Sequence, residues 1–154
     1  MNTEATGKTY QTFEDLDVYK EARKFRKLMC VVARKLPEEE KYALANQVRR
    51  AALSLTNNIA EGHGRFHFLD QVKFCLQARG SLEELLDDVN VCEDEHYLPE
   101  GETEKLKQEA WRVHKVLNGY IRFLRSRIAK IGPRVREEAD HYDWPDDFAK
   151  DESA

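Results

Sequence analysis

Apolar residues recur at steps of three and four along most of this chain, and this spacing constrains the fold more than any other feature. The clearest example is a stripe of six side chains, Val18, Ala22, Phe25, Met29, Val32 and Leu36. Residues at these steps lie on one face of an α-helix, so the segment is predicted to be an amphipathic helix. Glycine and proline are scarce, at 7 and 4 residues, which favours long helices over sheets.

Three later segments repeat this pattern, and each has its own apolar stripe. They span residues 38–61, 66–95 and 102–131. Four amphipathic segments in one chain of 154 residues predict a single all-α domain, because each helix must bury its apolar face against the others. We therefore expect a four-helix bundle over residues 13–131.

Several residue types mark the expected helix ends. Thr12 is placed to cap the first helix, which begins near residue 13. The run Glu38–Glu40 is expected in the first turn of the second helix, where carboxylates interact favourably with the helix dipole. Gly62 and Gly64 are expected to end that helix through a left-handed cap.

The formal net charge is −4, and it is distributed unevenly. Residues 132–154 carry three basic and eight acidic side chains, so this acidic tail has a charge of −5 and residues 1–131 have +1. We expect residues 1–12 and the tail to be disordered, because both are rich in polar and charged residues. The tail also contains Tyr142, Trp144 and Phe148, which offer a means of docking onto a basic helix face.

Composition also bears on location. The longest uninterrupted apolar run covers residues 29–33, far short of the ~20 residues that cross a membrane. The polar N-terminus has no signal-peptide core, so we expect a cytoplasmic protein with no membrane partner. Three cysteines, an odd number without a C-x-x-C pair, are expected to be small apolar residues in a reducing compartment.

Basic residues crowd the first predicted helix outside its apolar stripe, which makes this the most basic surface in the chain. Two interpretations remain: a solvated face, or a site for an anionic partner such as nucleic acid. The candidate nucleic-acid-binding residues come from the first two helices: Arg23, Lys27, Arg34, Arg49 and Arg50.

The second helix has short polar side chains opposite its apolar stripe, among them Ser54, Asn58 and Glu61. They form either an exposed face or a polar seam against another helix or subunit, where buried polar groups need partners. In the third helix Arg79 falls where the apolar stripe should continue, so it needs an acceptor, with Glu83 one turn away. The adjacent Gly80 suggests close backbone packing.

The fourth helix has the widest apolar arc, because Trp111 and Phe123 lie beside its stripe. A wide arc indicates contact on more than one side, so these two residues are candidates for an oligomer interface. We expect a homo-oligomer.

No catalytic constellation stands out. The spacings Glu93–His96 and Glu138–His141 match the Glu-x-x-His pairs of di-metal bundles, but no inward glutamates accompany them in the other stripes. No phosphate-binding glycine loop is present, and no serine or cysteine nucleophile has an identifiable base. We therefore predict no catalytic residues, no metal and no cofactor, and the protein is predicted not to be an enzyme.

Four blocks together carry a family resemblance: residues 13–19 (FEDLDVY), 47–52 (QVRRAA), 58–62 (NIAEG) and 78–84 (ARGSLEE), with Ser54 between the second and third. They resemble the bacterial four helix bundle proteins, also called 23S rRNA intervening-sequence or S23-type proteins. The likeness spans residues 13–123. The family motif residues map onto Arg49, Arg50, Ser54, Asn58, Glu61, Arg79 and Ser81. From this resemblance we expect five of them, Ser54, Asn58, Glu61, Arg79 and Ser81, to form one polar seam.

This resemblance implies an antiparallel, up-down-up-down, left-handed bundle that assembles into a ring-like homopentamer. It also implies kinship with the accessory proteins of diversity-generating retroelements, which bind nucleic acid and a reverse transcriptase through a basic surface. The role of the intervening-sequence proteins themselves is poorly defined. This chain departs from the strongly basic accessory proteins through its acidic tail and near-neutral body, and Tyr19 replaces the usual tryptophan of the first motif.

From these observations we expect an accessory protein that associates with RNA directly or forms part of a nucleoprotein. The alternative is a protein-interaction scaffold that oligomerises and recruits a protein partner without nucleic acid. Steeply salt-dependent RNA binding distinguishes the first function, because such affinity depends mainly on phosphate contacts.

Overall fold

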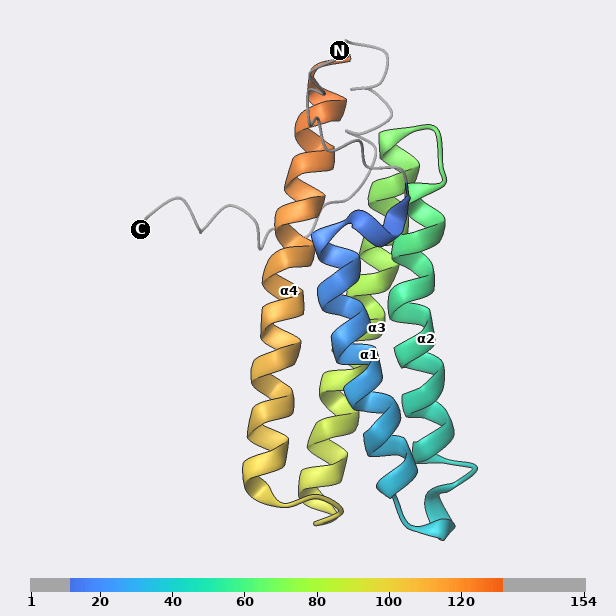
Figure 1. The fold of residues 1–154 in the computed structure, drawn as a ribbon, viewed down its shortest axis with the longest axis vertical. Coiled ribbons are helices and arrows are strands. Elements are labelled where there is room, and N and C mark those ends of the chain that lie inside the picture. Colours follow the sequence, from blue (N-terminus) through green and yellow to red (C-terminus); the bar gives the residue numbers. More distant parts are fainter. Residues whose placement is uncertain (1–11, 132–154) are drawn as a thin grey trace, which may run out of the picture.

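Four long helices form an antiparallel up-down-up-down bundle in the computed structural model, which describes residues 12–131 (Figure 1). The predicted fold class is confirmed. Each helix reverses the direction of the one before it, so consecutive helices lie next to each other. The elements in chain order are η1 (Phe13–Asp15), α1 (Asp17–Lys35), η2 (Glu38–Glu40), α2 (Leu44–His63), α3 (Phe68–Asp94) and α4 (Glu100–Ala129).

The helices occupy the corners of the bundle in a fixed order. α1 packs against α2 and α4, and α3 packs against the same two helices. α1 and α3 therefore lie at opposite corners, and Figure 1 shows α3 behind α1. The outer faces of α1 and α3 therefore point in opposite directions.

The core is formed by the apolar stripes that the sequence predicts. All six residues of the first stripe are buried, from Val18 to Leu36. In α2 the small Ala51 and Ala52 are also buried, which lets the neighbouring helices approach closely. Cys75 and Cys92 lie in the core of α3, and burial raises the pKa of the Cys75 thiol to about 12 and that of Cys92 to about 11. Both thiols therefore stay protonated and unreactive at neutral pH.

The start of the chain differs slightly from the expected helix. Thr12 does cap a helical turn, since its hydroxyl accepts from the Glu14 amide and the Asp15 carboxylate accepts from the Thr12 amide. This capping box closes the short 3₁₀ turn η1 rather than α1 itself.

Two predicted features of the second helix are wrong. Glu38–Glu40 do not form its first turn but a separate 3₁₀ turn, η2, and α2 begins at Leu44. Gly64 follows α2 with φ −75° and ψ −6°, an ordinary right-handed conformation instead of the left-handed cap expected there. Gly62 lies inside the helix and is buried.

Close packing requires glycine at position 62 but not at position 80. A Cβ built on Gly62 would lie 2.7 Å from the Phe74 Cβ, so the absence of a side chain lets α2 and α3 come together. A Cβ on Gly80 would meet nothing within 4 Å. The close packing predicted from Gly80 is therefore wrong within this chain, because this position faces outward on α3.

The connection between α3 and α4 is held by two features. His96 follows α3 in the left-handed region, with φ 55°, and Tyr97 donates its amide to the Cys92 carbonyl in the hydrogen-bond pattern of a Schellman cap. The Tyr97 hydroxyl donates to a Glu40 oxygen at 2.8 Å, which ties this connection to η2.

None of the helices within residues 12–131 is long and apolar enough to cross a bilayer. The predicted disorder concerns residues 1–12 and 132–154, which lie outside the described residues except for Thr12.

Candidate nucleic-acid interface

α1 is the most basic element of the bundle. It carries seven basic and only two acidic side chains, Asp17 and Glu21. Three of the basic groups have polar partners: Lys24 pairs with Glu21 at 2.8 Å, Lys35 pairs with Glu102 at 2.9 Å, and Arg26 donates to the Thr56 hydroxyl at 2.9 Å. Within residues 12–131 the side chains of the other four form no ion pair: Lys20, Arg23, Lys27 and Arg34.

The basic surface continues onto α2. The Arg26–Thr56 hydrogen bond sets the register of these antiparallel helices. Ala33 follows Arg26 by seven residues on α1, and Arg49 precedes Thr56 by seven residues on the antiparallel α2, so the two lie at about the same height in the bundle. Arg34, the neighbour of Ala33, therefore lies near the height of Arg49. Arg49 is half-buried and Arg50 is exposed.

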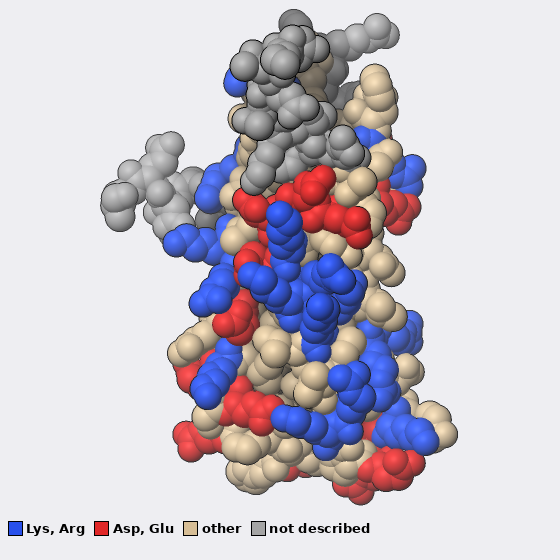
Figure 2. Space-filling view, viewed as in Figure 1, with Lys and Arg blue, Asp and Glu red and all other residues tan. Residues whose placement is uncertain are grey.

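We call this surface the basic face, and it consists of Lys20, Arg23, Lys24, Lys27, Arg34, Arg49 and Arg50. Figure 2 shows Lys and Arg side chains gathered over α1 in the middle of the molecule and continuing toward α2. This definition includes the five predicted nucleic-acid-binding residues, of which Arg23, Lys27 and Arg34 lie on α1 and Arg49 and Arg50 lie on α2. Lys20 and Lys24 extend it beyond those five.

α3 has the opposite charge. It carries seven acidic and two basic side chains, and it lies at the corner opposite α1. The near-neutral net charge of the bundle therefore conceals a separation of charge across its diagonal. Counting charges by helix would have found this contrast in the sequence, but the diagonal placement required the packing order.

Part of the predicted polar seam lies between α2 and α3. Ser81 Oγ donates to Ser54 Oγ at 2.8 Å, and Asn58 Nδ2 donates to the Ser54 carbonyl at 2.9 Å and to its hydroxyl at 3.0 Å. Ser81 is buried, whereas Ser54 and Asn58 are half-buried. These three residues form one satisfied network that fixes the register of the two helices.

The other two seam candidates lie elsewhere. The Glu61 carboxylate pairs with Arg65 Nη2 at 2.8 Å on an exposed part of α2. Arg79 crosses to α4, where its Nη1 donates to Asn118 Oδ1 at 3.3 Å. The five residues predicted as one seam are thus divided among different surfaces.

Arg79 belongs to a polar chain between α3 and α4. Asn118 Nδ2 lies 3.0 Å from His114 Nδ1, and His114 Nε2 lies 3.3 Å from Glu83 Oε1. Burial and the charge of Arg79 lower the pKa of the nearby Arg125 guanidinium. Sequence spacing pointed to Glu83 as the partner of Arg79, but partners on α4 cannot be found from spacing within α3.

The candidate metal-binding pairs acquire no further ligands within residues 12–131. This part of the chain holds no group of three His, Cys, Asp or Glu side chains that could bind a metal ion. Glu93 pairs with Lys107, and His96 lies in the turn after α3. The pair Glu138–His141 lies outside the described residues.

The sequence of this chain matches one protein-family model. The model for the 23S rRNA-intervening sequence protein matches residues 14–119, more than half of the chain. The chain belongs to the 23S rRNA-intervening sequence protein family. A comparison with curated proteins found no match.

The part of the chain that matches the 23S rRNA-intervening sequence protein model includes the whole basic face and the Ser54–Asn58–Ser81 network. It runs from η1 through α1, α2 and α3 and ends in α4 at Gly119. Trp111 lies inside the matched segment, whereas Phe123 lies beyond it. The basic surface of this family member is therefore part of the family domain.

Trp111 and Phe123 do not form one patch in this 23S rRNA-intervening sequence protein. Their exposed fractions are 59% and 53%, so both are available on the surface of a single chain. They are twelve residues apart on α4, which places them about 120° apart around the helix and about 18 Å along it. Trp111 packs edge-on against His114, and Phe123 stacks on Tyr120.

Proposed function

We propose that this protein is a non-enzymatic, cytoplasmic homo-oligomer that associates with structured RNA through the basic face. The separation of charge is the observation that carries the proposal: α1 has seven basic and two acidic side chains, and the acidic α3 lies on the opposite corner. A surface with many cations and few carboxylates attracts phosphates, whereas the neutral average of the molecule would not. Membership of the 23S rRNA-intervening sequence protein family also supports RNA as the partner.

The chemistry at this surface favours backbone contacts over reading of bases. Arg23, Lys27 and Arg34 are exposed and stand on a rigid helix, so they can follow the spacing of phosphates. Basic side chains that neutralise phosphates release counterions, which makes the affinity strongly dependent on salt. We expect recognition of the shape and charge of structured RNA, with little dependence on its sequence.

The test is a fluorescence titration of structured RNA at several salt concentrations. The variant Arg23→Gln/Lys27→Gln/Arg34→Gln is expected to lower the slope of log K against log salt by about 2 to 3, since each phosphate contact contributes roughly 0.7 to 0.9. The matched control removes three charges outside the basic face, Lys41→Gln/Lys73→Gln/Lys115→Gln. Absence of binding at low salt, or equal losses in both variants, rejects the proposal.

Self-association is supported by apolar side chains that one chain leaves exposed. Leu53 and Trp111 are each more than half exposed. We propose a homopentamer, following the family resemblance, with a mass of about 90 kDa for a chain of 18.0 kDa. Light scattering after size-exclusion chromatography measures this mass directly, and a species of about 18 kDa at micromolar concentration contradicts it.

The same exposed side chains favour a second candidate, a scaffold that recruits a protein without nucleic acid. Under that function a partner remains bound after nuclease treatment. The partner is released instead if RNA bridges the two proteins. Trp111→Ala is expected to weaken the scaffold interaction, whereas the basic-face variant is expected to leave it unchanged.

A further inference from the structure

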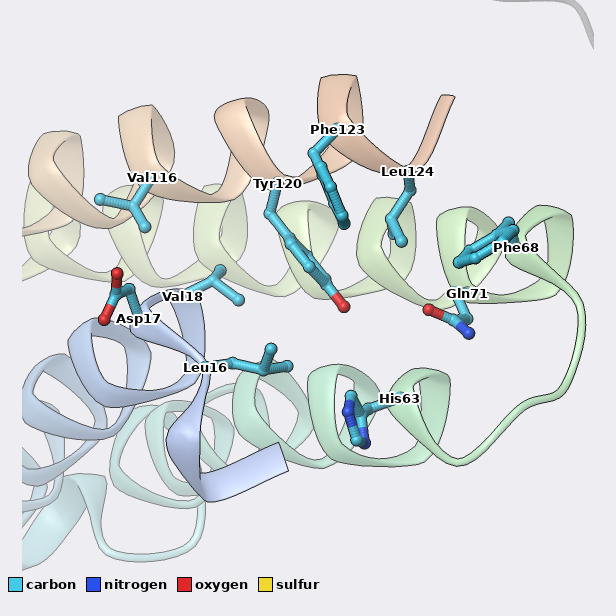
Figure 3. A pocket seen from close by; sticks show the side chains of 10 residues that line it. All are labelled: Leu16, Asp17, Val18, His63, Phe68, Gln71, Val116, Tyr120, Phe123 and Leu124. Atoms are coloured by element: carbon cyan, nitrogen blue, oxygen red, sulfur yellow. The ribbon is translucent and has the colours of Figure 1, made fainter. Parts of the chain in front are cut away.

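One end of the bundle has a hollow where α1 is missing. α1 begins at Asp17, whereas α4 continues to Ala129 and packs against α3. The hollow has a volume of about 570 Å³, and Figure 3 shows side chains from all four helical segments turned toward it. Most of the residues that line it are apolar or aromatic: Leu16, Val18, Phe68, Val116, Tyr120, Phe123 and Leu124. The others are Asp17, His63 and Gln71.

A second hollow of about 500 Å³ continues from the first along the junction of α1 and α4. Asp17 and Val116 line both hollows, so the two are adjacent, and we call them together the groove. The second part is mainly basic, although it also includes Glu21, which pairs with Lys24. Its basic side chains are Lys20, Arg23, Lys24, Lys27 and Arg112. The groove thus changes from apolar at one end to basic at the other.

We propose that the acidic tail, residues 132–154 of the same chain, occupies this groove. Trp144 and Phe148 enter the apolar hollow, and the neighbouring carboxylates face the basic part. The tail combines these aromatic side chains with eight acidic and three basic groups. This combination matches the groove in both properties, because apolar surface is buried in one part and opposite charges meet in the other.

The tail is long enough to reach the whole groove. Phe123 and Arg112 lie about 12 Å and about 28 Å back along α4 from Ile131, at 1.5 Å per residue. Trp144 lies 13 residues after Ile131. An extended chain of that length spans about 43 Å, so the tail can fold back beside α4 without strain.

Residues 1–11 are a poorer match for the same groove. They carry one acidic side chain, Glu4, one basic side chain, Lys8, and one aromatic side chain, Tyr10. They therefore have no net charge to complement the basic part. Charge complementarity assigns the groove to the tail rather than to this segment.

The occupied groove has a regulatory consequence, which rests on the proposed RNA function. Lys20, Arg23, Lys24 and Lys27 belong both to the groove and to the basic face. A docked tail would neutralise these residues and compete with RNA phosphates for them. Because the tail is tethered, its effective concentration is about millimolar, so a segment that binds with a dissociation constant of about 0.1 mM weakens RNA affinity roughly tenfold.

Docking itself can be measured without RNA. The chain has two tryptophans, Trp111 and Trp144, so the full-length variant Trp111→Phe reports on Trp144 alone. We expect its fluorescence to be blue-shifted and protected from acrylamide relative to a peptide of residues 132–154. Phe123→Glu should remove this protection, whereas Phe66→Glu, at an aromatic residue that is 92% exposed outside the groove, should not. Emission like that of the free peptide overturns the proposal.

Dilution identifies which copy supplies the tail. Protection that stays constant over a hundredfold dilution supports docking within one chain, and protection that disappears on dilution overturns it in favour of a neighbouring copy. Tyr10→Ser tests the alternative segment, and we expect it to leave the fluorescence unchanged.

Competition with RNA is tested in the full-length chain, with all tail charges retained. Trp144→Ser/Phe148→Ser is expected to tighten RNA binding roughly tenfold at low salt. Phe123→Glu should also tighten it, although this variant adds a negative charge. If Trp144 is protected but RNA affinity does not change in either variant, the tail does not cover the basic face and the regulatory inference fails. If no variant binds RNA, the RNA function fails while the docking result stands.

Discussion

Asp88 lies on the buried part of α3, with an exposed fraction of 6%. Its Oδ2 atom has no hydrogen-bond partner within the described residues. Burial raises the pKa of the Asp88 carboxyl from 3.8 to about 6, and the charges of Asp87 and Glu84 contribute further. At neutral pH the bundle therefore holds a carboxylate where a neutral side chain would be more stable.

The pKa shift gives both the size and the sign of the effect. A shift of about 2 units corresponds to about 3 kcal/mol, which is an upper bound. As the pH falls from about 6 to about 4, the folded state takes up a proton at Asp88 while the unfolded state does not. The contribution of Asp88 to stability therefore rises as the pH falls through this range, and it is least favourable above about pH 6.

The variant Asp88→Asn removes the charge and keeps the shape of the side chain. We expect it to stabilise the protein at pH 7 by about 2 kcal/mol, which raises Tm by about 5 to 10 °C. This is less than the upper bound of about 3 kcal/mol, because the buried amide also needs a hydrogen-bond partner. The gain should disappear near pH 4. Urea unfolding of both proteins at pH 4, 5, 6 and 7 measures the difference directly.

Asp87→Asn is the matched control, because Asp87 is exposed and its charge contributes less to the raised pKa of Asp88 than burial does. Its effect should stay within about 0.5 kcal/mol at every pH. A stability gain of Asp88→Asn that does not depend on pH between 4 and 7, or a loss at pH 7, would refute the reasoning.

Three further predictions concern backbone positions and use the same unfolding measurement. Gly62→Ala should destabilise the bundle by about 1 to 3 kcal/mol, because its Cβ would lie 2.7 Å from the Phe74 Cβ, and an unchanged stability would contradict the close approach of α2 and α3. Gly80→Ala should stabilise it by about 0.5 to 1 kcal/mol through helix propensity, since nothing lies within 4 Å of the new Cβ, and a loss of stability would contradict an open position there. His96→Gly should stabilise it by about 1 kcal/mol because His96 has φ 55°, and a loss of stability would show that the imidazole makes a contact that matters.

The sequence was sufficient for the helices and for their buried faces, because steps of three and four are a property of one helix alone. The stripe from Val18 to Leu36 is buried as the spacing predicts. The charge of α1 was also visible, since Arg23, Lys27 and Arg34 lie on one short segment. The features that depend on a single helix, its extent, its buried face and its charge, could therefore be predicted from the sequence.

Features that depend on two helices could not be predicted in this way. Spacing places Arg79 near Glu83, but the contact with Asn118 depends on how α4 lies against α3. Gly62 looks like a helix end in the sequence, and only the position of Phe74 shows why no side chain fits there. The predicted seam grouped Glu61 with Ser54 and Asn58 by helical spacing, although the three do not share one set of neighbours.

The unequal length of the helices has a consequence for motion. α1 has 19 residues and α4 has 30, about 28 Å and about 45 Å of helix, so the last turns of α4 lack the contact with α1 that its middle has. Backbone amides there should exchange with solvent rapidly, through small local openings. Amides near Leu117 should exchange more slowly, because their exchange requires a larger unfolding of the bundle. A deuterium-exchange map of α4 would therefore show where a molecule binds. A molecule bound at the open end would slow exchange of the amides in the last turns and leave exchange near Leu117 unchanged.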